Sequence, residues 1–157
     1  MSRPVLQPVF ALISEERRRA LEAAGLLILR VGVGGGMLFG HGLGKLLDYG
    51  AKSELFPDPL GIGAPLSMAL AIFAEALCAA LVVAGACTRL AVVPLLMTMA
   101  VAFLLVHAGD PWSRKELAFM YFVPFATLLL TGPGPWSVDG LLRARFADGE
   151  QPRERSA

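Results

Sequence analysis

The stretch AAGLLILRVGVGGGMLFGHGLGKLL, residues 23–47, decides the fold. It is long and apolar enough to form one spanning helix, because about twenty apolar residues cross the hydrocarbon core of a bilayer. Within it lie three basic side chains, Arg30, His41 and Lys45. At about 100° per residue they share one helix face, with Arg30 and His41 about 20° apart. Since ionisable groups are costly in lipid, this face is predicted to point into a helical bundle.

The same stretch carries a row of glycines at every fourth position, namely Gly32, Gly36, Gly40 and Gly44. Small residues at this spacing let the backbone of a neighbouring helix approach closely. The row lies on a different side of the helix from Arg30 and His41. The sequence therefore predicts one helix with a packing flank and a polar flank.

The whole chain has the composition of a membrane protein. Of its 157 residues, 55% are hydrophobic and 17% are charged, and the mean hydropathy is +0.62. A chain of this length is expected to form one domain. The formal net charge of +1 gives no reason to expect nucleic acid as a partner, and the lipid bilayer is the predicted environment.

Four apolar segments alternate with polar ones along the chain, and the last ends at Gly132-Pro133-Gly134-Pro135, a strong helix stop. They predict an all-α fold, an integral membrane four-helix bundle, with spans over residues 22–47, 65–86, 90–107 and 115–131. The membrane domain is expected over 22–142, between an N-terminal tail (1–21) and a C-terminal tail (143–157). An apolar piece of the first tail, Val5 to Ile13, suits the membrane surface.

The basic residues predict the orientation. Nine Lys or Arg fall in the N-terminal tail, the 85–89 turn and the C-terminal tail, whereas the other side carries Lys45, Lys52, Arg114 and Lys115. Because cytoplasmic segments are enriched in Lys and Arg, both termini are predicted to be cytoplasmic. An even number of spans agrees with this.

Depth along the helices then places the polar groups. His41 and Lys45 reach the outer end of the first span, and His107 and Glu116 are predicted at the same level of the third and fourth spans. These four form the expected outer polar cavity. Arg30 and Glu75 lie deeper, where they are expected to approach each other as a structural polar core.

Three chemistries remain open for the outer cavity. A quinone head group needs a His or Lys donor for its carbonyl oxygen and a carboxylate relay for protons. The two histidines suit the axial positions of a haem, and His41, His107 and Glu116 together suit a metal ion. Cys78 and Cys87, nine residues apart, are interpreted as small apolar fillers that cannot bridge each other within one helix.

These residues form a pattern that resembles the DoxX family of small four-helix membrane proteins, which includes DoxD-like members. The pattern consists of Leu29-Arg30, His41-Gly42 with Lys45, Glu75, His107, Glu116 and the ending Gly132-Pro133-Gly134-Pro135-Trp136-Ser137-Val138-Asp139. It covers about residues 25–142. The resemblance implies that the ionisable residues are the polar core and that Trp136, Ser137 and Asp139 have a structural role.

The resemblance also implies a multi-pass protein of the bacterial inner membrane with a redox or quinone connection. In the first hypothesis it is a quinone-linked protein or a subunit of a membrane oxidoreductase: His41 and Lys45 hold a quinone oxygen, while His107 and Glu116 move protons. In the second it is a non-catalytic anchor or assembly subunit, and in the third a small proton-linked transporter. The expected partners are other membrane or redox subunits, or a second copy of the chain.

Overall fold

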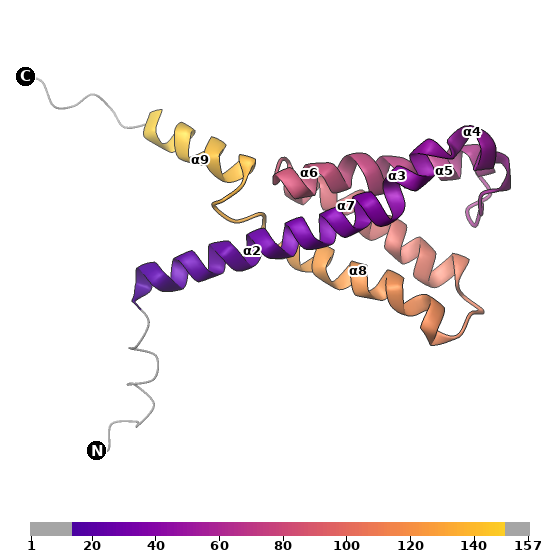
Figure 1. Ribbon diagram of the computed structural model, residues 1–157, viewed down its shortest axis with the longest axis horizontal. Helices are drawn as coiled ribbons and strands as arrows, with labels where there is room; N and C mark the ends of the chain where they lie inside the picture. The colour runs from indigo at the N-terminus through magenta and orange to yellow at the C-terminus, as the bar shows by residue number, and fades with distance from the viewer. Residues whose placement is uncertain (1–13, 150–157) are drawn as a thin grey trace, which may run out of the picture.

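The computed structural model describes residues 14–149, which are helical and contain no strand (Figure 1). The first long helix begins at Glu15, within the predicted N-terminal tail (1–21), where the Ser14 hydroxyl accepts a hydrogen bond from the backbone N–H of Arg17 at 3.3 Å. This helix runs without interruption through α2 (Glu15–Met37), the π-helical η1 (Leu38–Gly42) and α3 (Leu43–Leu47). Two short elements follow, α4 (Tyr49–Lys52) and the 3₁₀ turn η2 (Ser53–Leu55).

The second long helix comprises α5 (Ala64–Ile72), the π-helical η3 (Phe73–Cys78) and α6 (Ala79–Ala84). It ends at Gly85, whose φ of 71° is the left-handed conformation that favours glycine at a helix end. The third helix follows at once, as α7 (Thr88–Val101) and the π-helical η4 (Ala102–Val106). The short connection makes α6 and α7 packed neighbours.

Two further helices complete the described chain, α8 (Trp112–Thr131) and α9 (Val138–Gly149). The predicted C-terminal tail, from residue 143, therefore starts as helix, because α9 continues beyond the glycine and proline stop. The rest of that tail (150–157) and the predicted surface piece Val5 to Ile13 lie outside the described residues.

Within residues 14–149, three continuous helices are long and apolar enough to cross a membrane, Glu15–Leu47, Ala64–Ala84 and Thr88–Val106. The expectation of an all-helical membrane fold is thus confirmed. Helix α8 has 20 residues, but three ionisable residues, Arg114, Lys115 and Glu116, lie within its first five positions. A fourth span, and the side of the membrane on which each terminus lies, stay predictions.

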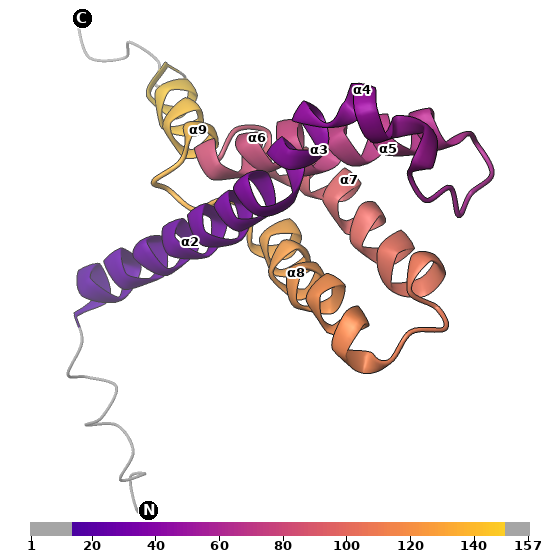
Figure 2. The ribbon, with the colours of Figure 1, turned by 45° about the vertical axis from the view of Figure 1, so that its right-hand side comes forward.

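The long helices pack together where α6, α7 and the second half of α8 meet the first helix, and they diverge at one end (Figures 1 and 2). There the α7–α8 hairpin points away from α3, α4 and α5. The α6–α7 turn lies beside Arg30, midway along the first helix, and the start of α2 and α9 extend away from it on the other side. The crossing region is packed with fully buried side chains, among them Met37, Val82, Leu95, Phe125 and Leu128.

In the first long helix, the glycines that pack against the backbone of another helix are Gly34 and Gly42. A Cβ on Gly34 would lie 3.2 Å from the carbonyl oxygen of Ala79, and one on Gly42 would overlap the carbonyl oxygen of Glu75. By contrast, a Cβ on Gly32, Gly40 or Gly44 would have no neighbouring atom within 4 Å. A Cβ on Gly36 would contact only the Tyr121 side chain. The predicted row Gly32, Gly36, Gly40 and Gly44 was therefore wrong as a packing surface within the described chain.

The π-helical turn η1 supplies the physical reason. A π turn holds one more residue than an α turn, so it rotates everything after it by about 100° relative to a regular helix. With that rotation Arg30, Gly34 and Gly42 lie on one buried face. The regular spacing used for the sequence does not hold beyond residue 38.

Candidate polar site between the first two helices

An ion pair joins the two first helices inside the protein. The ammonium group of Lys45 in α3 contacts the carboxylate of Glu75 in η3. The Glu75 side chain is only 5% exposed and that of Lys45 is 26% exposed. A buried carboxylate is costly unless an opposite charge compensates it, and Lys45 does so here. The absence of a side chain at Gly42 allows the close approach of the helices that makes this contact possible.

His41, one helical turn before Lys45, makes a second contact between helices. The ring of His41 in η1 meets the ring of Tyr121 in α8 edge to face, with centroids 5.6 Å apart and an interplanar angle of 88°. Tyr121 also stacks against Phe125, with centroids 6.2 Å apart. A Cβ on Gly36 would lie 2.9 Å from the Tyr121 hydroxyl, so this glycine leaves room for the phenol.

We refer to His41, Lys45, Glu75 and Tyr121 as the polar site. His41 and Lys45 are four positions apart, so their contacts are adjacent on the helix surface. The site combines hydrogen-bond donors with one buried carboxylate, and π-helical turns carry His41 and Glu75. Such turns occur frequently at functional sites. Sequence reasoning missed Tyr121, although a phenol within an apolar segment signals a need for a polar partner.

Arg30 does not approach Glu75, so the predicted pairing of these two residues was wrong. Arg30 is only 3% exposed, and its guanidinium donates hydrogen bonds to the carbonyl oxygens of Pro133, at 3.3 Å, and Trp136. A side chain at Gly85 would collide with this guanidinium. Arg30 therefore ties α2 to the turn after α8. It does not reach Glu75, because Glu75 lies opposite Gly42, which is about 18 Å further along the helix.

His107 and Glu116 do not join the polar site. His107 follows η4, and its Nδ1 lies 2.8 Å from a carboxylate oxygen of Asp110. This hydrogen bond holds the pKa of the Asp110 carboxyl below its usual value. Glu116 is exposed, and no hydrogen bond or ion pair joins it to another described residue. The four-residue outer cavity was wrong because the α7–α8 hairpin diverges from α3 (Figure 2).

The metal alternative fails on the same geometry. Among residues 14–149, no three His, Cys, Asp or Glu side chains lie close enough together to hold a metal ion. His41, His107 and Glu116 are thus not a ligand set. The two imidazoles contact different partners, Tyr121 and Asp110, which gives no support to shared haem ligation. Cys78 is buried and Cys87 is exposed, and both are free thiols.

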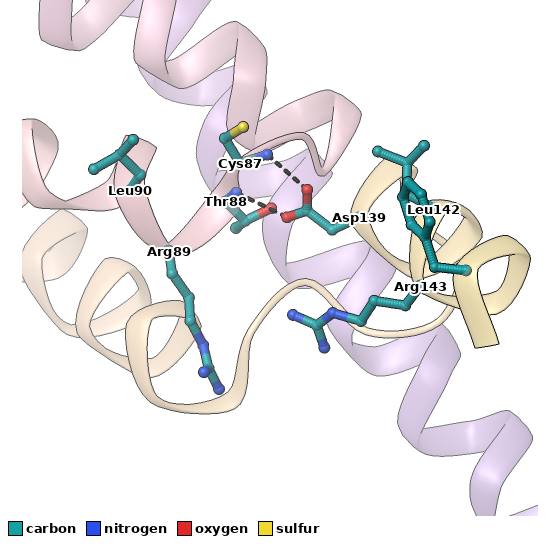
Figure 3. Close-up of a pocket in the computed structure, with 8 residues that line it drawn as sticks. Cys87, Thr88, Arg89, Leu90, Asp139, Leu142 and Arg143 are labelled. Carbon is teal, nitrogen blue, oxygen red and sulfur yellow. Dashed lines mark hydrogen bonds between the residues drawn. The ribbon is translucent and has the colours of Figure 1, made fainter. Parts of the chain in front are cut away.

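The motif after α8 organises the opposite end of the protein. The Ser137 hydroxyl donates to the carbonyl oxygen of Gly134 at 2.6 Å and accepts from the N–H of Gly140 at 3.0 Å. The Asp139 carboxylate accepts from the backbone N–H groups of Cys87, at 2.7 Å, and Thr88, at 2.9 Å (Figure 3). Asp139 thereby caps the start of α7. The Trp136 side chain is exposed, and its carbonyl binds Arg30.

The comparisons with known proteins agree with this architecture. The model of the DoxX family matches residues 25–108 of the chain. The chain belongs to the DoxX family. This DoxX protein is also similar to the uncharacterized membrane protein Rv3486 of Mycobacterium tuberculosis, with 33% identity over 124 residues that cover 63% of this chain and 75% of the relative. No solved structure matches it.

The region matched by the family model contains three members of the polar site, His41, Lys45 and Glu75, together with Arg30. Tyr121 lies beyond the match, as do Glu116 and the motif after α8. In this DoxX protein the matched helices thus carry the ion pair, and α8 adds the phenol that covers His41.

Proposed function

We propose that this DoxX protein binds the head group of a membrane quinone at the polar site, as a quinone-linked redox protein or as a subunit of a membrane oxidoreductase complex. The observation that supports this best is the buried Lys45–Glu75 ion pair one helical turn from His41. Buried ionisable groups in membrane helices are expensive, and they commonly mark a ligand or proton pathway.

The chemistry of the site suits a quinone. Quinone carbonyl oxygens accept hydrogen bonds, and the His41 ring, the Tyr121 hydroxyl and the Lys45 ammonium donate them. Reduction of a quinone to the quinol consumes two electrons and two protons. His41 and Glu75 are the groups that exchange protons. The electrons come from a redox partner subunit with its own electron carrier, which is the connection that the family resemblance implies.

The direct test is binding of decylubiquinone to the purified full chain in lipid nanodiscs. Loss of one hydrogen bond corresponds to about tenfold in affinity, so we expect His41→Ala to weaken binding by about that factor and Tyr121→Phe by a similar or smaller one. Glu116→Gln is the matched control, because Glu116 is an exposed ionisable residue outside the polar site. A wild-type chain that binds no quinone, or equal effects of His41→Ala and Glu116→Gln, would show the proposal to be wrong.

A second candidate function, the non-catalytic membrane subunit, is supported by a different observation. Gly32, Gly40 and Gly44, which we call the exposed glycine row, face open space along the first helix. A helix of a partner protein, or of a second copy, fits such a surface closely. We expect Gly40→Leu to abolish co-purification with that partner, while Gly50→Leu, at an exposed glycine in α4, leaves it unchanged. If the Gly40→Leu variant still co-purifies with the partner, this candidate is contradicted.

We also propose that the protein lies in the bacterial inner membrane with both termini in the cytoplasm and with α8 as a fourth span. The start of α2 and α9 lie at the same end of the structure, which an even number of spans requires (Figure 1). Fusions of green fluorescent protein and of alkaline phosphatase to the C-terminus test the topology. We expect the green fluorescent protein fusion to be fluorescent and the alkaline phosphatase fusion to be inactive. The reverse pattern would contradict the proposed orientation.

A further inference from the structure

Helix α9 carries apolar side chains that the described chain does not cover. Leu141, Leu142 and Phe146 are 64%, 46% and 74% exposed. The helix is held to the body of the protein at its beginning, where the Asp139 N–H donates to the carbonyl oxygen of Gly85 at 2.9 Å and its carboxylate caps α7. From residue 141 to residue 146 every side chain is exposed. Since exposed apolar side chains on a short helix are unfavourable in water, they indicate a surface that another phase or molecule covers.

A pocket of about 450 Å³ lies between α9 and the start of α7. Its lining combines two guanidinium groups, those of Arg89 and Arg143, and the carboxylate of Asp139 with three apolar side chains, those of Leu90, Leu142 and Phe146. In Figure 3 the two arginine side chains extend from the two walls of this pocket, Arg89 from α7 and Arg143 from α9. This combination fits an amphiphile that has an anionic head and an apolar body.

The charges in the pocket are available for such a head group. The Asp139 carboxylate is bound to the backbone N–H groups of Cys87 and Thr88. Its charge attracts Arg143, but no hydrogen bond or ion pair joins it to either arginine within the described residues. Arg89 uses one donor, to the carbonyl oxygen of Leu130 at 3.1 Å. A guanidinium has five N–H donors, so the others remain. No hydrogen bond or ion pair joins Arg143 to another residue within 14–149.

The same end of the protein carries further arginines beyond the pocket, two of which, Arg18 and Arg19, are paired with Glu15 and Glu22. Arg17 at the start of α2 and Arg145 in α9 are both exposed there (Figure 1). At the opposite end, the segment between the first two long helices carries one basic residue, Lys52, which is paired with Asp48, and the acidic residues Glu54 and Asp58. An anionic leaflet attracts a cluster of arginines next to membrane helices, and an amphipathic helix beside it lies in the plane of the interface.

We propose that α9 is an interfacial helix and that its pocket binds an anionic phospholipid of the surrounding bilayer. Arg89 and Arg143 bind the phosphate, while Leu90, Leu142 and Phe146 contact the first part of the acyl chains. The bilayer, rather than a soluble anion, is the source of the ligand, because the phosphate site is bordered by exposed apolar side chains. This inference does not depend on quinone binding, since no residue of the polar site lines the pocket.

Native mass spectrometry of the full chain, released from nanodiscs of mixed phosphatidylglycerol and phosphatidylcholine, tests the pocket. We expect the wild type to retain phosphatidylglycerol in preference to phosphatidylcholine, and Arg143→Gln to reduce that retention about fivefold. Arg145→Gln is the matched control, because Arg145 belongs to the same helix but does not line the pocket. Equal retention of both lipids by the wild type, or equal losses in the two variants, would overturn the proposal.

A competition experiment distinguishes a pocket that binds a lipid from one that binds a free anion. Inorganic phosphate at matched ionic strength is expected to leave the retained phosphatidylglycerol in place, since it lacks the acyl chains. Displacement by phosphate, but not by chloride at the same ionic strength, would make the pocket a site for a soluble anion and would overturn the lipid assignment.

Spin labels test the position of α9 independently. In a Cys78→Ala, Cys87→Ser background, labels are placed at Phe146→Cys and Ala144→Cys, which point to nearly opposite sides of the helix at about 100° per residue. We expect the label at 146 to be accessible to oxygen dissolved in lipid and the label at 144 to a water-soluble nickel reagent. If both labels meet the nickel reagent equally, α9 does not lie in the interface.

Discussion

Lys45 and Glu75, thirty positions apart in the sequence, form an ion pair beside the closest backbone contact between the first two helices. That backbone contact is made by Gly42, which leaves no room for a side chain against the carbonyl oxygen of Glu75. The ion pair and the glycine contact therefore fix the same helix register. A change at any of these three residues affects both the packing of the helices and the charge balance of the polar site.

Removal of one member of the ion pair should destabilise the protein more than removal of both. Glu75→Gln or Lys45→Met leaves one charge without its partner, and we expect each to lower the free energy of unfolding by about 1–3 kcal/mol, since Lys45 is partly solvated. The double variant should lose less than the sum. Unfolding in mixed micelles measures all three, and strictly additive losses would show that the two residues are not coupled.

Gly42 and Gly40 should respond differently to the same substitution. Gly42→Ala places a methyl group against the backbone of η3, so we expect a loss of about 1–3 kcal/mol in the free energy of unfolding. Gly40→Ala meets open space and should be neutral or slightly stabilising, because alanine favours helix. Thermal unfolding of the two variants in parallel makes the comparison, and equal stabilities would contradict the packing described for η1.

Arg30 should not tolerate replacement by lysine. The guanidinium binds two carbonyl oxygens of the turn after α8, and an ammonium group at the end of a lysine side chain does not reproduce this fork. We expect Arg30→Lys to lower the free energy of unfolding by about 2 kcal/mol, while Arg17→Lys, at an exposed position, has little effect. Faster proteolysis after residue 131 in the Arg30→Lys variant would show that the turn after α8 is less tightly held. Unchanged cleavage would argue against the role of Arg30 in holding this turn.

Asp139 should stabilise the protein in a pH-dependent way. Burial raises the pKa of its carboxyl, but the N–H groups of Thr88 and Cys87 outweigh burial and hold the pKa below its usual value. Because the folded-state pKa is the lower one, the stabilisation is complete above the unfolded-state pKa of about 4 and is lost as the pH falls through the folded-state value. We expect Asp139→Ala to cost about 1 kcal/mol at neutral pH.

Melting temperatures of wild type and Asp139→Ala from neutral pH down to about pH 3 test that sign, since the difference between them should shrink on acidification. Asp48→Ala is the control, because Asp48 makes only an exposed ion pair with Lys52. If the difference in melting temperature grows as the pH falls, the pKa of the Asp139 carboxyl is not lowered in the folded protein.

Helix positions were largely predictable because they depend on local features. The apolar runs, the Ser14 cap and the glycine at 85 lie within a few residues of the boundaries that they set. The importance of Arg30, His41, Lys45 and Glu75 was predictable as well, because ionisable residues in apolar segments require partners. Helix α9 was missed, since its apolar and basic residues follow a stop signal and resemble a tail.

The partners of those ionisable residues were decided by the tertiary structure. A π-helical turn rotates Gly42 onto the buried face, and no residue pattern in the sequence indicates that extra residue. Crossing angles then separate His107 from His41, bring Tyr121 to His41 and leave Arg30 beside the turn after α8. The sequence alone determined which segments are helical and which side chains need compensation. Which residues compensate them depends on helix rotation and crossing, and these follow from packing between segments far apart in the chain.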